Sequence, residues 1–493
     1  MREINIEDYI NLINVDALAV DKNGKKIAAI LSQNFREYKK EKAKKFIKIY
    51  GSDLKETYND EGYGIHSLDF SSDGRLLYID GTKIKIVSSD ESEIMSVDTG
   101  LNVIDAKWHS KSILFIGQKN KMDAEDDAYY YEDDDLYCDL YRLDFDSGIK
   151  KVTDRVQVWE FATNGSSIAA ITSEKPQESG WYRSKVSVIS EDGSVGQIYD
   201  PKFRQIGNIA ISRKGKIAFE ESIMSDRGVI SGDIIVIDGK NVSNITENSD
   251  KSYSHIEFDG ENIIAMENEE SSFRIKNFGG ETVDIGTGIV YPVFSPAFSY
   301  GNEMYAYAFS DVKEATHIVI RRNGRNESIN INGNLRIREY PFEKITWKSR
   351  DGTEIYGFLR SIGKDKPLIV YIHGGPTSFS YPACIDRTSV YLGYGFSVFL
   401  PNYRGSVGKG RNYAESNIGD LGGMDFEDIM SGIDFLRNNG YVNTDRIYIT
   451  GGSYGGYMSA LAVVKSDNFK ASVSLYGISD WISFHGTSNL YEW

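Results

Sequence analysis

The chain has 493 residues, of which 40% are hydrophobic and 26% charged, and its formal net charge is −16. This composition is typical of a soluble globular protein, and the length predicts at least two hydrophobic cores. The negative charge argues against nucleic acid or an anionic membrane as a partner. No apolar run reaches the ~18 residues of a membrane span, and the N-terminus lacks the apolar segment of a signal peptide, so we expect a cytoplasmic location.

The cysteine and histidine content argues against a metal centre. Cys138 and Cys384 are the only cysteines, too few for a disulfide framework or a cysteine-based zinc site. The six histidines show no spacing that resembles a metal site. We therefore expect no metal and no other cofactor.

A repeated pattern occupies residues 15–335, after a segment, 1–14, that we expect to form a short helix or strap. Each copy is an apolar strand, a polar turn rich in Asp, Asn and Gly, and a second apolar strand, which predicts a hairpin. The clearest copies lie at 18–28 and 68–78, and weaker ones lie at 103–115, 161–171, 209–219, 256–264 and 294–308. A spacing of about 40–50 residues fits one four-stranded blade per copy, so seven copies predict a seven-bladed β-propeller. A pair of β-sandwiches is the alternative.

Acidic residues at 123–127 and 132–135 flank three tyrosines within this repeat region. The stretch lacks the residue order of a calcium loop. We interpret it as a solvated loop between propeller strands. The alternative is an acidic rim that attracts peptides by their ammonium ends.

A different pattern begins at residue 336. Strands are predicted at 344–349 and 354–359, joined by a turn, and then at 367–372 and 395–400, where continuous apolar runs are typical of strands buried on both faces. Asp425 is the predicted N-cap of a helix that Gly440 can end. Strands that alternate with helices predict a mostly parallel sheet, whose last recognisable strand is 471–476.

Ser453 is the candidate nucleophile. It lies in the sequence Gly-Gly-Ser-Tyr-Gly-Gly at 451–456, between an apolar strand and a helix-like segment. In α/β-hydrolases a Gly-x-Ser-x-Gly turn in this context holds the serine hydroxyl clear of the backbone. The sequence His-Gly-Gly-Pro at 373–376 follows a buried strand, where such enzymes place an oxyanion-binding loop. We predict that the amides of Gly375 and Tyr454 form the oxyanion hole.

A base for Ser453 is harder to find, because in this fold the acid and the histidine follow the serine in the chain. We expect His373 to be packed on the oxyanion side and His485 to lie in a surface loop. The other four histidines fall in the predicted propeller: His66, His109, His255 and His317. We therefore predict that neither the triad Asp nor the triad His is present in this chain.

Three motifs together resemble the prolyl oligopeptidase family, in its acylaminoacyl peptidase and dipeptidyl peptidase-like branch. They are His-Gly-Gly-Pro at 373–376, Pro-Asn-Tyr-Arg-Gly-Ser at 401–406 and Gly-Ser-Tyr-Gly-Gly-Tyr-Met at 452–458. The resemblance implies a serine peptidase whose propeller caps the active site and admits only short peptides. It also implies that Trp481 forms a wall of the pocket for the residue before the cleaved bond, although a core tryptophan would look the same. Arg404 is expected to brace the loops.

The chain departs from the family pattern at its C-terminal end. Family members place the acid and the histidine roughly 80 and 110 residues beyond the nucleophile, which would fall past residue 493. The last sheet strands would fall there too, so we expect 336–493 to be a partial α/β-hydrolase domain with 471–476 as an exposed edge. An incomplete chain, a split or interrupted gene, and a degenerate protein remain as explanations.

The expected function is hydrolysis of short peptides, as an acylaminoacyl- or oligopeptidase, through an acyl-enzyme on Ser453. We expect the chain by itself to be inactive or nearly so. A separately encoded C-terminal segment, or self-association, is the expected partner besides the peptide substrate. The alternative is a catalytically silent protein of the same fold that binds peptides or partners.

Overall fold

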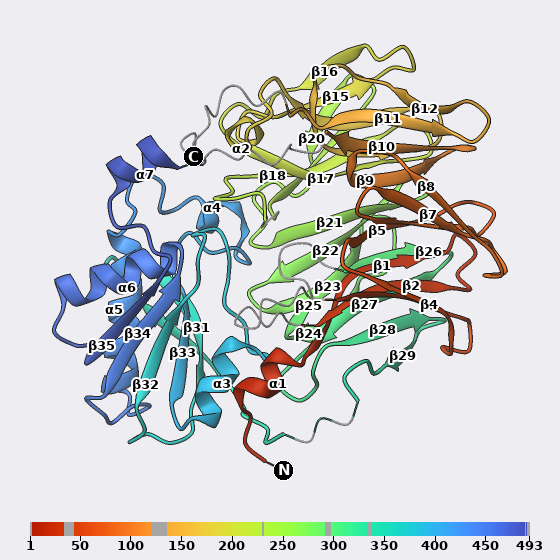
Figure 1. The fold of residues 1–493 in the computed structure, drawn as a ribbon. Coiled ribbons are helices and arrows are strands. Elements are labelled where there is room, and N and C mark those ends of the chain that lie inside the picture. The colour runs from red at the N-terminus through yellow and green to blue at the C-terminus, as the bar shows by residue number, and fades with distance from the viewer. Residues whose placement is uncertain are drawn as a thin grey trace, which may run out of the picture.

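The computed structural model describes residues 2–33, 44–119, 136–228, 231–290, 297–333, 335, 337–488 and 490. Two bodies lie side by side, a ring of antiparallel sheets and an α/β domain (Figure 1). None of the helices in these residues is long and apolar enough to cross a membrane.

The ring consists of seven sheets that follow one another along the chain. The first four contain β1 Ile13–Val20, β2 Ile27–Gln33, β3 Lys45–Tyr50 and β4 Glu56–Gly62; β5 Ile65–Phe70, β6 Leu76–Asp80, β7 Lys83–Val87 and β8 Ile94–Asp98; β9 Asn102–His109, β10 Ser112–Gln118, β11 Asp139–Asp144 and β12 Gly148–Lys151; and β13 Gln157–Thr163, β14 Ile168–Ser173, β15 Lys185–Ile189 and β16 Val195–Tyr199. A short helix, α2 Glu178–Trp181, connects β14 to β15.

The other three sheets complete the ring. They contain β17 Gln205–Ile211, β18 Ile217–Ser222, β19 Asp233–Asp238 and β20 Asn241–Asn244; β21 Ser252–Asp259, β22 Asn262–Glu269, β23 Ser272–Asn277 and β24 Val283–Thr287; and β25 Ile289–Val290, β26 Phe298–Gly301, β27 Met304–Ser310, β28 His317–Arg322 and β29 Arg325–Ile329. Neighbouring strands in each sheet are antiparallel, because hairpins connect most of them. The predicted seven-bladed β-propeller is confirmed.

Hydrophobic side chains between neighbouring sheets hold the ring together. In the described residues a separate buried cluster lies between each adjacent pair of blades. The cluster that closes the ring combines Val15 and Leu31 of the first blade with Ala306 and Ile318 of the last. The Val20 amide also donates to Ser299 Oγ across this junction, at 3.1 Å. The ring is therefore closed by packing rather than by a strand shared between the two ends.

The α/β domain has a six-stranded sheet in the order β30-β31-β33-β32-β34-β35. Its strands are β30 Glu343–Lys348, β31 Glu354–Arg360, β32 Leu368–Ile372, β33 Ser397–Asn402, β34 Ile447–Gly452 and β35 Ala471–Leu475. The four strands from β32 to β35 are parallel, as predicted, and β30 and β31 form the predicted hairpin. β35 lies at the edge, with no further strand beside it in the described residues.

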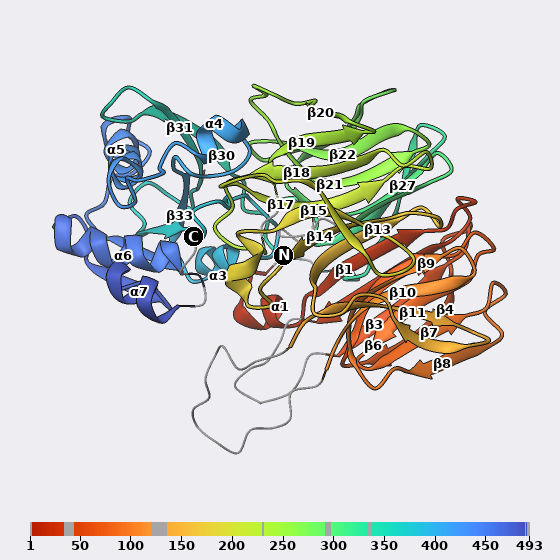
Figure 2. The ribbon, with the colours of Figure 1, turned by 90° about the horizontal axis from the view of Figure 1, so that it is seen from above.

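Helices cover both faces of this sheet. They are α3 Arg387–Gly393, α4 Gly410–Ala414, α5 Met424–Asn438, α6 Tyr454–Lys465 and α7 Trp481–Thr487. On one face α5 and α6 pack on a core that includes Trp347, Phe399 and Met458. On the other face lies α3, beside the N-terminal helix α1 Ile6–Ile10, as Figures 1 and 2 both show.

The helix α1 ties the chain start to the α/β domain. Asn5 caps it in a capping box with Asp8, and Ile4 and Leu12 are buried in the same cluster as Tyr356 of β31. The short helix expected in residues 1–14 is therefore present. Domain limits at 14/15 and 335/336 stay predictions.

One predicted helix start is wrong. The N-cap of α5 is Gly423, not Asp425, and Asp420 Oδ2 accepts the Met424 amide at 2.8 Å instead. Asp425 lies within the first turn, fully buried, because its carboxylate accepts a hydrogen bond from the Tyr454 hydroxyl. The predicted end is confirmed, since Gly440 has φ +72° immediately after the C-cap.

Candidate active site

Ser453 lies on a tight turn between β34 and α6. Its backbone has φ 55° and ψ −120°, a conformation that non-glycine residues rarely adopt and that stores strain. The flanking glycines are required by space, because a Cβ on Gly451 or Gly455 would collide with the Ile372 carbonyl oxygen. Ser453 itself is exposed. The turn therefore presents the serine hydroxyl at the carboxyl end of the parallel strands, as the motif predicted.

The loop 373–376 passes directly beside this serine. A Cβ on Gly374 would lie 3.4 Å from Ser453 Cβ, so a larger residue there would crowd Ser453. Gly375 has φ +113°, and a side chain on it would collide with the following turn. The Tyr454 amide belongs to the first turn of α6, where amides have no acceptor inside the helix. This arrangement is compatible with Gly375 and Tyr454 as oxyanion donors, a role that stays a prediction.

His373 is part of the support for that loop. Its ring is buried and stacks on Tyr403, with 4.4 Å between ring centroids. Its Nδ1 lies 2.8 Å from the Gly374 carbonyl oxygen, and its Nε2 lies 2.9 Å from Ser406 Oγ. Burial lowers the pKa of His373 from its ordinary value to about 4, so the ring is neutral at pH 7. The expectation of a packed histidine is confirmed.

No hydrogen bond joins Ser453 Oγ to a histidine in the described parts of the chain. His485 is exposed but lies in the helix α7, not in a surface loop as predicted, because Asp480 caps a helix there. The remaining four histidines have neighbours within the propeller: His66 with Val103, His109 with Thr163, His255 with Glu257, and His317 with Ala315. Among the described residues, Ser453, the predicted nucleophile, thus has no hydrogen-bonded histidine.

Two buried carboxylates lie behind the turn. Asp428 is fully buried and accepts hydrogen bonds from the Arg404 guanidinium at 2.8 and 2.9 Å, while Asp351 holds the other side of the same guanidinium. Burial raises the pKa of Asp425 to about 6, and its contact with Tyr454 ties α5 to α6. Arg404 therefore braces the loops, as expected. Sequence reasoning missed the Asp425 contact, whose only signal was an acidic residue beside an apolar helix face.

A cavity of about 620 Å³ lies beside Ser453 between the two domains. The α/β domain contributes Gly375, Arg387 and Tyr476 to its lining, and the propeller contributes Asp226. Cavities of this size bind small molecules and short peptides, most often at domain interfaces.

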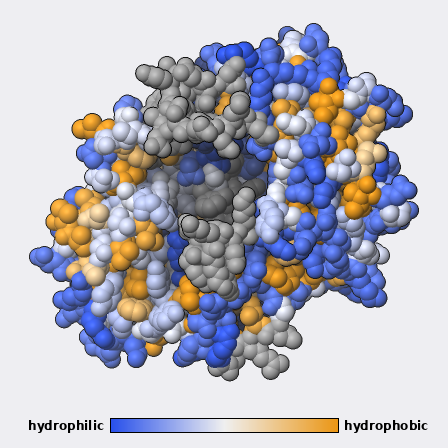
Figure 3. All heavy atoms as spheres, viewed as in Figure 1, coloured by the Kyte–Doolittle hydropathy of each residue, from blue (hydrophilic) through white to orange (hydrophobic). Residues whose placement is uncertain are grey.

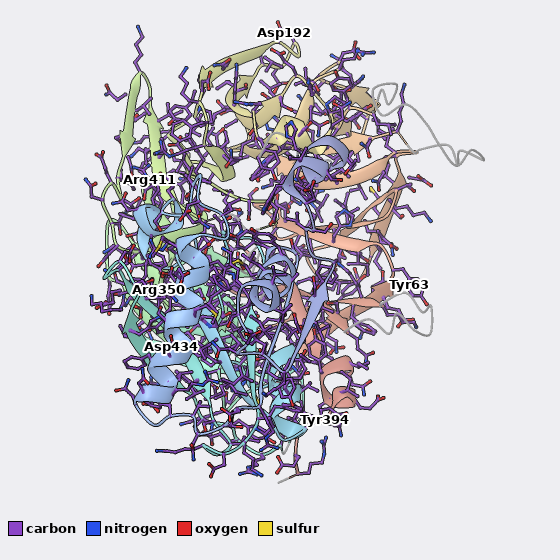
Figure 4. All side chains as sticks on the ribbon, turned by 90° about the vertical axis from the view of Figure 1, so that its left-hand side faces the viewer. Tyr63, Asp192, Arg350, Tyr394, Arg411 and Asp434 are labelled. Carbon is purple, nitrogen blue, oxygen red and sulfur yellow. The ribbon has the colours of Figure 1, made fainter. Side chains whose placement is uncertain are left out.

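Contacts across the domain interface fix the position of this cavity. The Ser225 amide donates to Thr377 Oγ1 at 2.7 Å, two residues beyond Gly375. Farther away, Arg411 of α4 forms an ion pair with Asp233 at 3.0 Å, and Figure 4 shows Arg411 at the border with the propeller. The propeller is thereby fastened to the loop that carries a predicted oxyanion donor.

Trp481 is not among the residues that line this cavity. It begins α7 and packs on α6, with its ring 5.1 Å from that of Tyr457 and 6.2 Å from that of Tyr454. Its proposed role as a pocket wall stays a prediction. Phe379 and Tyr476 are aromatic lining residues that sequence reasoning did not find.

Two further expectations concern other parts of the chain. The acidic stretch at 123–135 lies outside the described residues. Within the described ranges no cluster of three or more His, Cys, Asp and Glu side chains could hold a metal ion.

Part of the chain is similar to known peptidases. Residues 384–493 match the model of the prolyl oligopeptidase family. The uncharacterized peptidase YuxL of Bacillus subtilis is 35% identical over 154 residues, which are 30% of this chain and 23% of the relative's length. The chain thus spans less than two thirds of this relative.

Two solved structures share this fold along almost the whole of the chain. The acylaminoacyl peptidase of Pyrococcus horikoshii superposes with a TM-score of 0.80 at 20% identity, covering 100% of this chain and 82% of that one. An acylaminoacyl peptidase in complex with Z-Gly-Gly-Phe-chloromethyl ketone superposes with a TM-score of 0.79 at 20% identity, covering 99% and 82%. Residues 384–493 therefore match the prolyl oligopeptidase family, and the chain has the propeller-and-hydrolase fold of these acylaminoacyl peptidases.

Proposed function

We propose that this chain carries the nucleophile and the substrate cavity of a serine peptidase that hydrolyses short peptides, as an acylaminoacyl- or oligopeptidase. The observation that carries the proposal is the strained Ser453, exposed to a cavity that both domains enclose, beside a glycine loop. A strained backbone at a serine is costly and persists at functional sites.

The reaction begins when Ser453 Oγ attacks the carbonyl carbon of the scissile peptide bond. The carbonyl oxygen then becomes an oxyanion, which the Gly375 and Tyr454 amides stabilise by hydrogen bonds. Collapse of this intermediate expels the amine and leaves an acyl-enzyme ester on Ser453, which water hydrolyses.

The hydroxyl proton needs an acceptor during the attack. His373 does not serve, because both of its ring nitrogens face the loop and Ser406. We propose that the base and its carboxylate come from polypeptide outside the described residues. Without them the oxyanion hole and binding still give a residual rate of roughly 10³–10⁴ over water.

The size of the cavity limits the substrate. At about 620 Å³, between propeller and hydrolase domain, it fits a few residues of an extended peptide rather than a folded protein. The complex of an acylaminoacyl peptidase with a short peptide chloromethyl ketone supports this size class for the fold.

A fluorophosphonate reagent tests the identity of the nucleophile. After long incubation of the purified chain, mass spectrometry of the digested protein should locate the adduct on Ser453. The Ser453→Ala variant should give no adduct. Ser466→Ala, which removes a serine hydroxyl at the end of the same helix α6, should label like the parent chain.

An adduct on another serine, or no adduct at all, would contradict the proposal. The second result would favour a catalytically silent protein that keeps the fold.

A further inference from the structure

Arg387 is the one arginine or lysine among the described residues that line the cavity beside Ser453. It is the first residue of α3, and its side chain is exposed. The first turn of a helix is an unfavourable place for a cation, because the N-terminal end of the helix dipole is positive. Helix geometry therefore does not explain a positive charge at this position.

No carboxylate of the described residues is among the groups that act on the Arg387 charge. The cavity lining contains three carboxylates, and each of them is bonded to another group: Asp16 to Lys45 Nζ at 2.9 Å, Asp226 to the Gly228 amide at 2.9 Å, and Asp386 to the Ser389 amide at 2.6 Å. The positive charge of Arg387 thus has no ion-pair partner within the described structure.

The neighbours of Arg387 are tyrosine hydroxyl groups. Its Nη1 donates to the Tyr476 hydroxyl at 3.2 Å, and the hydroxyl groups of Tyr371 and Tyr9 are the other polar groups that act on its charge. Neutral hydroxyl groups accept hydrogen bonds but do not neutralise a cation, and a guanidinium has five N–H donors. Arg387 therefore keeps both charge and donors for an anion in the cavity.

Tyr476 connects Arg387 with the nucleophile. A Cβ on Gly452, the residue before Ser453, would lie 2.8 Å from the Tyr476 hydroxyl oxygen. The hydroxyl that Arg387 contacts thus lies against the backbone of the turn that carries Ser453. An extended peptide advances about 3.3–3.6 Å per residue, so one or two residues reach from the Ser453 side chain to the guanidinium.

We propose that Arg387 binds a carboxylate of the substrate, one or two residues from the bond that Ser453 cleaves. The carboxylate is either the C-terminus of a very short peptide or an Asp or Glu side chain. A carboxylate matches this group because its two oxygens accept two parallel N–H hydrogen bonds from one guanidinium. The inference rests on the proposed function and adds a substrate class to it, peptides with a negative charge next to the cleaved bond.

Calorimetric titration of the Ser453→Ala chain tests this assignment without turnover. The ligands are N-acetylated dipeptides in three pairs. The first pair is dialanine with a free C-terminal carboxylate or with a C-terminal amide. The other two pairs are amides that carry glutamate or glutamine, in the first or in the second position. At least one carboxylate peptide should bind about tenfold more tightly than its neutral counterpart, and the pair that shows this ratio identifies the source of the carboxylate.

Variants of arginine locate the effect. Arg387→Gln should bring the affinity ratio within that pair close to 1, whereas Arg387→Lys keeps the charge without the paired donors and should give an intermediate ratio. Arg350→Gln, a change of an exposed arginine in the turn between β30 and β31, should leave the ratio unchanged. If Arg387→Gln fails to fold, Tyr476→Phe serves instead, because it removes the hydroxyl that holds the guanidinium and should lower the ratio.

Equal affinities within all three pairs, or a ratio that survives the loss of Arg387, would overturn the inference. A carboxylate preference that does not weaken as the salt concentration rises would also contradict it, because salt screens the attraction between exposed charges. Failure here is separable from failure of the proposed function, because labelling of Ser453 by the fluorophosphonate involves no substrate carboxylate.

Discussion

The two sides of Ser453 differ in how completely the chain encloses them. On the side of the glycine loop, His373, Tyr403, Arg404 and Asp428 are buried and bonded to one another or to the loop. On the side of the sheet edge, Val473, Tyr476 and Ile482 are 55%, 73% and 85% exposed. Figure 3 shows hydrophobic side chains on the flank where α6 and β35 lie.

This difference separates two requirements of catalysis. The parts predicted to hold the nucleophile and to bind the oxyanion are supported by side chains that are buried within the described structure. A base must approach the hydroxyl from another direction, and the side at β35 does not provide one among these residues. Changes on the two sides should therefore have unequal effects.

The largest effect is expected at Arg404. The Arg404→Met variant leaves the fully buried Asp428 carboxylate without its cation, and breaking a buried pair in this way typically costs about 3–5 kcal/mol. The matched change on the exposed side, Ile482→Ala, should alter the free energy of unfolding by less than about 0.5 kcal/mol. Urea denaturation of both variants measures the comparison, and a loss below about 1 kcal/mol for Arg404→Met would contradict it.

Glycine-to-alanine changes on the two sides should have opposite signs. In Gly455→Ala the new Cβ collides with the Ile372 carbonyl oxygen, so we expect a loss of about 1–3 kcal/mol and slower labelling of Ser453. In Gly486→Ala, within α7, the new Cβ meets nothing within 4 Å, so helix propensity should stabilise the protein by about 0.5–1 kcal/mol. Thermal unfolding of the two variants measures the sign of each change in stability. If both variants gain stability, the turn has more room than its contacts indicate.

Asp425→Asn should change the pH dependence of stability. Burial raises the pKa of Asp425 to about 6, which is above the pKa of the same carboxyl in the unfolded chain. The contribution of the protonated carboxyl to the free energy of unfolding is therefore present below about pH 4 and is lost as the pH rises through 6. Asparagine does not ionise, so the variant should gain on the parent chain by about 2 kcal/mol between pH 4.5 and 7.5.

The control for this change is Asp434→Asn on the exposed face of the same helix α5, where Figure 4 labels Asp434. Its difference from the parent chain should be the same at both pH values. Denaturation curves at pH 4.5 and 7.5 measure both variants, and a flat difference for Asp425→Asn would show that the carboxyl ionises freely in the fold.

The smallest effect concerns strain at the nucleophile. Ser453→Gly removes the side chain from a backbone with φ 55°, so we expect a gain of about 1 kcal/mol in the free energy of unfolding. Ser453→Ala keeps the Cβ and should show no such gain, although both variants lose labelling. Equal stabilities of the glycine and alanine variants would mean that the turn stores no strain at this residue.

Much of this architecture follows from local sequence signals. Seven hairpins with polar turns predicted the propeller, and the run from a buried strand through Gly-x-Ser-x-Gly to a helix predicted the turn at Ser453. Those signals are local because they depend on a few neighbouring residues.

Other features depend on contacts between distant residues, and the sequence does not show these. By its sequence position Asp425 resembles a helix cap. Its carboxylate is instead buried, because it accepts a hydrogen bond from the hydroxyl of Tyr454, 29 positions later in the chain. The cavity at Ser453 combines Asp226 and Tyr476 from two domains.

Chemical rescue by imidazole tests the central claim, that Ser453 is mounted beside its oxyanion loop but lacks a base within the described residues. The measured quantity is the rate of fluorophosphonate labelling of Ser453 as a function of imidazole concentration, above the ordinary histidine pKa of ~6.5. We predict slow labelling that accelerates in proportion to the concentration of neutral imidazole, and no labelling in Ser453→Ala. Fast labelling that imidazole leaves unchanged would contradict it, because a base would then already be in contact with the serine.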